Sequence, residues 1–477
     1  MKTFKILLLA IFPLLFFSCS EDKMDEINRE RNEALEMSTQ SMLPDVILKS
    51  AFEATGTDLA WYASVYIEQS AGTWPQSYDQ DKRVGQTDAT LMNNLWNGIY
   101  DNLNTLKDII GKTEPDGAEP DAMFARGVAQ ILTAYNLAIL TDSWGEIPWE
   151  EALQGAAILQ PKYDNQSTIY PKIQQLLSDA ITTLSDVTSR SVAEDYIYGG
   201  SAEAWITAAW SLKARYAMRL SNVDTDAASD ALTFLADGFG SAADNLVFAA
   251  YEETASGENP WYQFYFDRSH LSVSQTLYDL MNARNDPRIA VFVEQIDGAY
   301  APAPSGAATQ TQGGLYSTSL LTVNGRTAPA PLMTYHELLF IEAEARFRTA
   351  PASTAAWQNA LADAIAATFE YHGLDAAAAA TYFTDEVLPL LTPGNELKEI
   401  LTQKYIGLFE HEAIEVYNDY RRVPSFLTLN NPNNATTGFV WRYPYPTSEE
   451  SANSANIPDV NVFSDKVWWA GGTEKAN

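Results

Sequence analysis

Tryptophan and tyrosine are the residues best suited to chemistry in this chain, because they gather in segments rich in proline and glycine. Trp74 and Tyr78 lie in one such segment, and Trp261, Tyr262 and Tyr265 lie in another. Indole and phenol rings can bury the apolar C–H faces of a sugar, while their polar edges hydrogen-bond to its hydroxyl groups. Packing explains any single ring more readily, but the cluster as a whole favours ligand binding.

We expect the two segments to hold one ligand between them. The first, residues 72–85, contains Gly72, Pro75 and Gly85, and these residues favour a loop that leaves the helical body. Arg83 in this segment can donate a forked pair of hydrogen bonds to sugar hydroxyls or to a carboxylate. The predicted binding residues are Trp74, Tyr78, Arg83, Trp261, Tyr262 and Tyr265. Trp74→Ala and Trp261→Ala should leave folding nearly unchanged if these two rings face solvent in the free protein.

The catalytic motifs in the chain are incomplete. His411 and Glu412 begin a zinc-protease-like motif, but Glu415 stands where the second histidine is required. Neither a nucleophile elbow nor a phosphate-binding loop occurs in the sequence. We therefore predict no catalytic residue, no metal and no cofactor. A hydrolase stays open as an alternative, because the two carboxylates of a glycosidase need not be neighbours in sequence.

Cys19 is the only cysteine, which excludes a disulfide within the chain and a zinc cluster built from several thiolates. It follows Lys2, Lys5 and the apolar run 7–17, which is too short to span a bilayer but is typical of a secretory signal. This arrangement resembles a lipoprotein signal, with acylation at Cys19. We expect a signal peptide at residues 1–18, a lipid-anchored tether at 19–39 and a single domain at 40–477.

The overall composition is that of a folded, acidic protein. Hydrophobic residues make up 46% of the chain, and 62 Asp and Glu against 30 Lys and Arg give a net charge of -32. Such a charge serves solubility and repels phosphate backbones, so nucleic acid is not an expected partner.

Helical periodicity dominates the chain and must position the aromatic segments. Small and aromatic residues alternate on the inner faces of the expected helices, which is the packing of tetratricopeptide-type helix pairs. The sequence thus predicts an all-α fold, a tetratricopeptide-like helical repeat core with a long loop-rich ligand-binding face. The segments with helical spacing are 94–110, 122–140, 167–184, 202–220, 335–348, 355–372 and 395–417, and the expected irregular segments are 72–85, 238–270, 297–331 and 421–477.

Five short motifs, taken in order, resemble the SusD/RagB family of outer-membrane lipoproteins over nearly the whole chain. We interpret most of their residues as determinants of the fold, and we expect Asp419 to pair with Arg421 or Arg422 and to pin the C-terminal segment. The motifs are TDSWGEIPW at 141–149, NP at 259–260 with DPR at 286–288, ELLFIEAE at 337–344, QKYIGL at 403–408 with DYRRVP at 419–424, and RYPYP at 442–446.

The resemblance implies a surface-exposed lipoprotein that is not an enzyme. Proteins of this family have an all-helical body with four repeat-like helix pairs, and they lie as lids over TonB-dependent transporters. By this resemblance the chain captures a nutrient, most simply an oligosaccharide, and delivers it to a SusC-like transporter in the outer membrane. A peptide ligand is the first alternative, and a helical scaffold without a binding pocket or a surface glycan hydrolase are the others.

Overall fold

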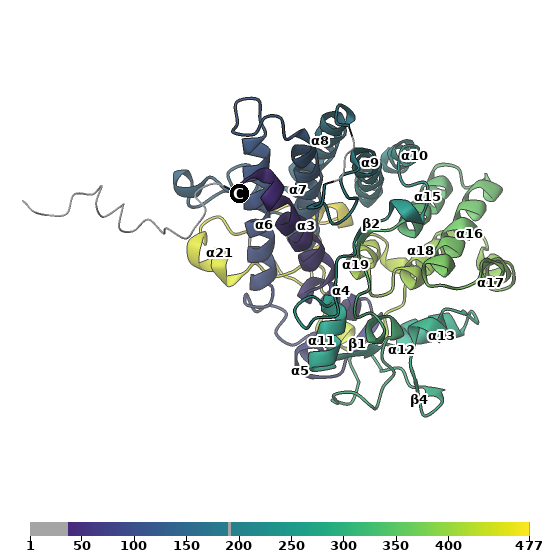
Figure 1. Cartoon of the computed structure of the whole chain (residues 1–477). Helices are drawn as coiled ribbons and strands as arrows, with labels where there is room; N and C mark the ends of the chain where they lie inside the picture. The colour runs from purple at the N-terminus through teal and green to yellow at the C-terminus, as the bar shows by residue number, and fades with distance from the viewer. Residues whose placement is uncertain (1–36, 189–191, 477) are drawn as a thin grey trace, which may run out of the picture.

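Helices packed on their neighbours in sequence form most of the structure, a computed structural model that describes residues 37–188 and 192–476 (Figure 1). Cys19, the expected signal peptide and residues 19–36 of the expected tether lie outside the described residues. The helices are α3 (Thr39–Thr55), α4 (Asp58–Tyr66), α5 (Pro75–Asp81), α6 (Asn93–Lys112), α7 (Met123–Trp144), α8 (Gln166–Ser185), α9 (Ala202–Arg219), α10 (Ala227–Leu235), α11 (Pro260–Arg268), α12 (Gln275–Asn282), α13 (Ile289–Phe292), α14 (Leu320–Val323), α15 (Tyr335–Thr349), α16 (Thr354–Tyr371), α17 (Ala376–Tyr382), α18 (Glu396–Gly407), α19 (Ala413–Arg422), α20 (Asn433–Thr436) and α21 (Thr447–Ala452).

The strands in the described residues are short and pair only two at a time, all antiparallel. They brace the helical body without forming a sheet layer, so the predicted all-α class with a helical-repeat core is confirmed. The pairs are β1 (Ser70–Gly72) with β3 (Leu271–Val273), β2 (Leu246–Phe248) with β6 (Ala330–Met333), and β4 (Gln295–Ile296) with β5 (Ala299–Tyr300).

The helical body forms an arch in which each long helix packs on the one before it. Helices α6, α7, α8, α9 and α10 follow one another in contact, α10 then contacts α15, and α15 contacts both α16 and α18 (Figure 1). Helices α5, α11, α12 and α13 lie together below this arch in the same view. The long helices therefore support one region in which the shorter elements gather.

Helix α7 lies at the centre of the core. By length and composition it could cross a membrane, but 89% of its most apolar window is buried inside the protein. It contacts α3, α6, α8 and α9, which cover its surface on several sides. A helix that is apolar all round and covered by other helices is a core helix.

The predicted helix 395–417 is wrong as a single element, because the chain breaks between α18 and α19. Glu410 has a φ of 63°, in the left-handed region that a helix of L-residues does not use. The amide of His411 turns back to the carbonyl of Phe409 at 2.8 Å. The apolar spacing continues across the break, which is why periodicity alone could not detect it.

All four predicted irregular segments contain short helices, which are α5, α11, α14, α20 and α21. Helix α5 lies within residues 72–85, and α11 lies within residues 238–270. Both helices begin with proline at the first position, Pro75 and Pro260, where the missing N–H costs nothing. These two segments were expected to be loops because α5 and α11 are short and contain proline.

Charged motif residues are buried between the helices in ion pairs. Arg215 of α9 contacts Glu337 of α15 and lies 3.2 Å from Glu412. Lys404 of α18 lies 2.9 Å from Asp419 and 3.5 Å from Glu337. Burial alone would raise the pKa of Asp419, but Lys404 holds it below its usual range. Buried charges are tolerated only when paired in this way, so these pairs lock the relative positions of the helices.

The expected ion pair of Asp419 is made by Arg422, at 2.9 Å. Arg422 also bonds Glu344 at 2.7 Å, whereas Arg421 donates to the backbone carbonyl of Trp441 at 3.0 Å. The C-terminal segment is therefore held by Arg421, and Arg422 joins α19 to α15. These motif residues serve the fold, as the sequence interpretation proposed.

Candidate ligand-binding face

Strands β1 and β3 bring the two predicted aromatic segments side by side. Gly72 pairs with Leu271, and the amide of Thr73 donates to the carbonyl of His270 at 2.9 Å. A Cβ atom at Gly72 would lie 1.9 Å from the carbonyl oxygen of Ser77, so only glycine permits the tight turn into α5. Two segments about 190 positions apart thus share one part of the surface.

Helix α11 is capped at its N-terminus, and its outer side is more exposed than its inner side. The side chain of Asn259 accepts a hydrogen bond from the amide of Trp261 at 2.9 Å, which caps the helix. On its outer side Tyr262 and Phe266 stack with ring centroids 6.0 Å apart and an interplanar angle of 12°. Phe266 is 72% exposed. This pair, one helical turn apart, forms an aromatic platform that we call the α11 ladder.

Trp261 is on the inner side of α11, so its ring does not meet the condition of facing solvent. Its indole is 7% exposed and its Nε1 donates to the carbonyl of Thr55 at 2.7 Å. Its ring meets Trp61 edge-on at 6.5 Å, and Phe264 stacks on Trp61 at 3.7 Å. Trp261 anchors α11 to the end of α3, because a large ring with a satisfied N–H is stable in a core.

The guanidinium of Arg83 is also directed into the protein, which corrects the expectation of a free hydrogen-bond donor. Arg83 is 4% exposed and has a φ of 61°. It donates to Asn434 Oδ1 at 2.9 Å and to the carbonyl of Gln80 at 3.0 Å, and it lies 5.1 Å from the centre of the Tyr66 ring. Arg83 therefore ties the end of α5 to the C-terminal segment.

Trp74, Tyr78 and Tyr265 are half-buried, so each presents part of its ring to the surface. Trp74 directly precedes α5, and the Nζ atom of Lys82 lies 5.1 Å from the centre of the Tyr78 ring. Tyr265 belongs to α11 and lines the small pocket beneath it. These three predicted residues remain candidates for ligand contact.

A third segment, residues 309–316, completes this part of the surface. The amide of Thr311 donates to the carbonyl of Thr73 at 2.8 Å, and the side chain of Gln312 donates to the carbonyl of Arg268 at 2.7 Å. Leu315 in this segment is 48% exposed. The three segments adjoin, and we call their half-buried and exposed residues Trp74, Tyr78, Tyr262, Phe266 and Leu315 the α5–α11 face.

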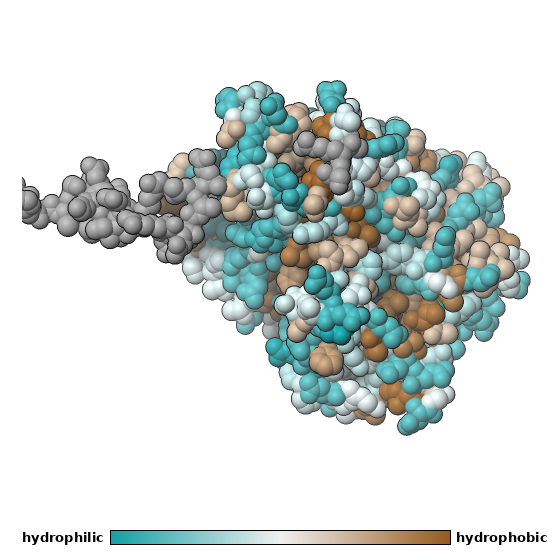
Figure 2. Space-filling model, viewed as in Figure 1, coloured by the Kyte–Doolittle hydropathy of each residue, from teal (hydrophilic) through white to brown (hydrophobic). Residues whose placement is uncertain are grey.

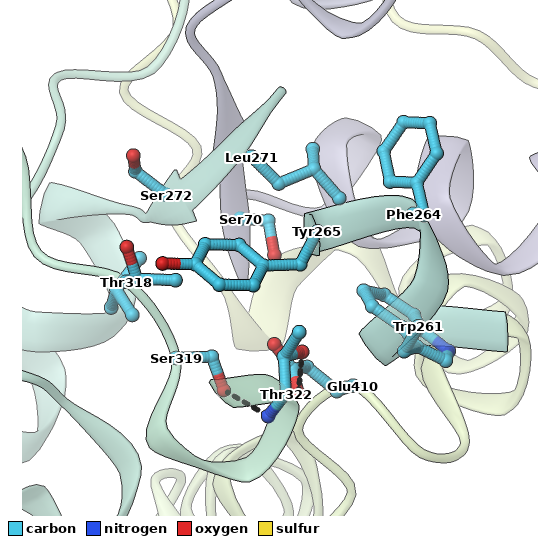
Figure 3. A pocket seen from close by; sticks show the side chains of 11 residues that line it. Ser70, Trp261, Phe264, Tyr265, Leu271, Ser272, Thr318, Ser319, Thr322 and Glu410 are labelled. Atoms are coloured by element: carbon cyan, nitrogen blue, oxygen red, sulfur yellow. Dashed lines mark hydrogen bonds between the residues drawn. The ribbon is translucent and has the colours of Figure 1, made fainter. Parts of the chain in front are cut away.

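The pocket beneath α11 is too small for a sugar ring (Figure 3). The centre of a water-sized sphere can move within only about 20 Å³, which is room for about one water molecule. The ring of Tyr265 extends across it, with its hydroxyl toward Thr318. Glu410 at its base accepts a hydrogen bond from the Thr322 hydroxyl at 2.9 Å, and burial raises the pKa of Glu410 to about 7. A sugar ring therefore does not fit inside this pocket.

Phe266 and Leu315 are the residues of this face that sequence reasoning missed. The signal for Phe266 was present: Asn259 and Pro260 are a capping residue followed by proline, which predicts a helix start. A helix from Pro260 puts Tyr262 and Phe266 on the same side. Leu315 had no local signal. Within residues 37–188 and 192–476, no group of three or more His, Cys, Asp or Glu side chains is placed to hold a metal ion.

A family model places this helical body in a class of proteins associated with the outer membrane. The chain belongs to the SusD-like family: the family model described as starch-binding associating with outer membrane matches residues 31–446. Members of this family are binding proteins and generally not enzymes. No curated protein matches the chain.

Solved structures agree with this assignment. A SusD/RagB family protein from Bacteroides thetaiotaomicron VPI-5482 is 34% identical, with 92% of this chain and 100% of that chain covered and a TM-score of 0.83. A chitin-binding protein is 25% identical, with 91% and 99% covered and a TM-score of 0.75. A chitin-binding SusD homolog from Flavobacterium johnsoniae, at 21% identity, 90% and 98% coverage and a TM-score of 0.75, shares the fold.

Proposed function

We propose that this chain is a surface-exposed lipoprotein, anchored through Cys19, that binds a nutrient oligosaccharide on the α5–α11 face. It then delivers the oligosaccharide to a SusC-like TonB-dependent transporter in the outer membrane. Binding without catalysis is the activity proposed. Chitin-type oligosaccharides are the first ligands to test, because two similar structures are of chitin-binding proteins.

The proposed binding site rests on one observation, the stacked rings of the α11 ladder. An isolated pair of stacked rings with Phe266 72% exposed leaves apolar surface in water. Burial of that surface by the C–H face of a sugar is favourable, and a phenol hydroxyl such as that of Tyr262 can hydrogen-bond to the sugar. Trp74 and Tyr78 border the same face through the β1–β3 pairing. The arrangement therefore suits a chain of neutral rings.

Titration calorimetry with an N-acetylglucosamine hexasaccharide, maltohexaose and a neutral hexapeptide tests the ligand class. Stacking of a ring on an aromatic side chain is worth about 1–3 kcal/mol for nucleobases. On that scale, Phe266→Ala is expected to weaken binding of the preferred oligosaccharide by about 10-fold or more, since 1.4 kcal/mol is a factor of ten. The melting temperature is expected to change little, because the ring is exposed.

Tyr196→Ala is the matched control, because Tyr196 is 47% exposed on another part of the surface. It should leave the affinity unchanged. If Phe266→Ala and Tyr196→Ala both bind the oligosaccharide as the wild type does, the α11 ladder is not the site. If only the hexapeptide binds, the ligand is a peptide. Release of shorter sugars from the hexasaccharides would instead show a hydrolase.

A further inference from the structure

A second hollow lies on the other side of α14 from the pocket beneath α11. Thr322 of this short helix lines the small pocket, whereas Leu320 and Leu321 line an open groove of about 430 Å³. Ligand sites typically occupy about 300–1,000 Å³, so this groove has the size of a binding site. Figure 2 shows hydrophobic surface gathered in the lower right of the view, around the position of α12 and α13 in Figure 1. We call this hollow the His411 groove.

The lining of the His411 groove carries no Asp, Glu, Lys or Arg, although the protein has 62 acidic residues. Its two histidines, His372 and His411, are uncharged at neutral pH. Burial lowers the pKa of His411 to about 4. Burial, followed by the neighbouring His411 and His336, lowers the pKa of His372 well below its usual value. An uncharged groove in a protein with a net charge of -32 suits a neutral ligand better than an ion.

The groove combines an apolar side with a hydrogen-bonding side. Val291, Leu320 and Leu321 are half-buried along it and supply aliphatic surface. No hydrogen bond in the described part of the chain engages the ring nitrogens of His411 or the side chain of Asn324, and both residues line the groove. The buried Nε2 of His372 also has no hydrogen-bond partner. A neutral imidazole offers one donor and one acceptor, which matches a hydroxyl group.

We propose that the His411 groove is a second glycan-binding site, which holds one neutral sugar ring with its C–H face on Leu320 and Leu321 and its hydroxyls toward His411 and Asn324. This site is separate from the α5–α11 face. The assignment of a sugar as its ligand rests on the proposed function. Helix α14 contacts α11, whose outer side carries the α11 ladder, and Leu320 and Leu321 of α14 line the groove. A glycan of several rings would then have two places to bind on elements that pack together.

Nuclear magnetic resonance of the full chain labelled with ¹³C at the histidine Cε1 position can observe both sites at once, because the protein has only four histidines. His270 packs edge-on against Phe264 of α11 at 5.3 Å and reports on the α5–α11 face. His372 and His411 report on the groove. The signals are assigned with His270→Gln, His372→Gln and His411→Gln. We expect the N-acetylglucosamine hexasaccharide or maltohexaose to shift the signals of His372 and His411 in a saturable way.

Leu321→Arg puts a cation into the groove and should weaken the response of His372 and His411 about 10-fold or more. Leu159→Arg is the matched control, because Leu159 is 75% exposed elsewhere on the surface, and it should leave both responses unchanged. Neither substitution should alter the response of His270. The folding of each variant is checked by its melting temperature, and Asn324→Trp, which fills the groove from an exposed position, gives a second test if Leu321→Arg is unstable.

A response of His270 alone would overturn the groove and leave the proposed function intact. A response of His372 and His411 alone would support the groove and place the main site away from the α11 ladder. If the signals of His372 and His411 shift in Leu321→Arg and Asn324→Trp as they do in the wild type, the groove is not the sugar site. If these signals shift only with the neutral hexapeptide, the assignment to sugars is also overturned. No response of any histidine to either hexasaccharide would overturn it as well.

Discussion

Two aromatic residues of α11, Trp261 and Phe266, have opposite environments although five positions separate them. Trp261 is 7% exposed and bonded to the carbonyl of Thr55, whereas Phe266 is 72% exposed. Substitution of the first is therefore expected to change the free energy of unfolding, and substitution of the second is expected to change ligand affinity. Trp74, which is half-buried, lies between these extremes.

Trp261→Ala is expected to lower the free energy of unfolding by about 3–5 kcal/mol, the usual cost of removing a buried tryptophan or phenylalanine ring. Urea denaturation followed by circular dichroism measures this change. Trp261→Phe keeps a ring but removes the N–H, so it should cost less than Trp261→Ala. A Trp261→Ala protein with the stability of the wild type would show that the ring does not anchor α11.

Trp74→Ala is expected to weaken oligosaccharide binding about 10-fold, on the scale of about 1–3 kcal/mol per stacked ring. Its effect on unfolding should be smaller than that of Trp261→Ala, because part of the ring is already exposed. Calorimetry and urea denaturation on the same sample separate the two effects. Unchanged affinity together with a large loss of stability would identify Trp74 as a packing residue.

The break between α18 and α19 determines which parts of the structure the side chains of residues 410–412 contact. Glu410 in the left-handed conformation turns its side chain to Thr322 of α14, while the following His411 lines the groove. Glu412, two positions on, contacts Arg215 of α9. A continuous helix would place these side chains on successive positions around one axis. The break therefore connects the pocket, the groove and the buried ion pairs.

Stability is expected to fall as the pH rises from about 4.5 to about 7, because burial raises the pKa of Glu410 to about 7 from a usual value near 4.5. In that window the native state binds more protons than the unfolded state, so protonation stabilises the fold and the gain is lost at higher pH. The full effect is about 3 kcal/mol, at 1.36 kcal/mol per pKa unit. Glu410→Gln should therefore be more stable than the wild type at pH 8, with the difference vanishing below about pH 5.

Urea denaturation at pH 5, 6, 7 and 8 gives this difference directly. Burial also raises the pKa of Glu53 and Asp81 to about 7, so only the difference between wild type and variant isolates Glu410. Glu252→Gln removes an exposed carboxylate and should follow the wild-type profile. If Glu410→Gln is less stable than the wild type at pH 8, the ionised carboxylate is required by the fold.

The molecule as a whole joins an acidic helical body to a proposed lipid anchor. The described helix that is apolar enough to cross a membrane, α7, is 89% buried in the core. The proposed attachment therefore depends on the residues around Cys19. One acyl chain binds a membrane only marginally and two give stable anchoring, so the diacylation expected of a lipoprotein suffices.

Cys19→Ala is expected to abolish labelling by an alkynyl fatty acid and to move the protein out of the membrane fraction. Ser20→Ala keeps the cysteine and should be labelled as the wild type is. Labelling and fractionation are measured on the same cells. Equal labelling of wild type and Cys19→Ala would refute acylation at this residue.

A tagged copy of the chain is expected to co-purify with a TonB-dependent barrel from detergent-solubilised outer membranes. Mass spectrometry of the purified material identifies the barrel. Another tagged SusD-like lipoprotein from the same cells controls for conditions that keep such complexes intact. Recovery of a barrel with the control protein but none with this chain would count against the proposed delivery.

Local patterns in the sequence determined most of the helical body. The spacing of apolar residues predicted α6, α7, α8, α9, α15 and α16 to within a few residues at each end, because periodicity is a property of neighbouring positions. The motifs and their order indicated the family, and the family model agrees. The same spacing wrongly predicted one continuous helix in place of α18 and α19. The left-handed residue Glu410 breaks the helix but leaves the apolar spacing intact.

The tertiary structure alone decided which aromatic and charged side chains are free to meet a ligand. The indole N–H of Trp261 donates a hydrogen bond to the carbonyl of Thr55, 206 positions away in the sequence. The guanidinium of Arg83 donates to Asn434, 351 positions away. Burial is the sum of contacts from elements that no local window contains. Sequence therefore located the two aromatic segments, whereas long-range packing turned Trp261 and Arg83 inward and left Phe266 exposed.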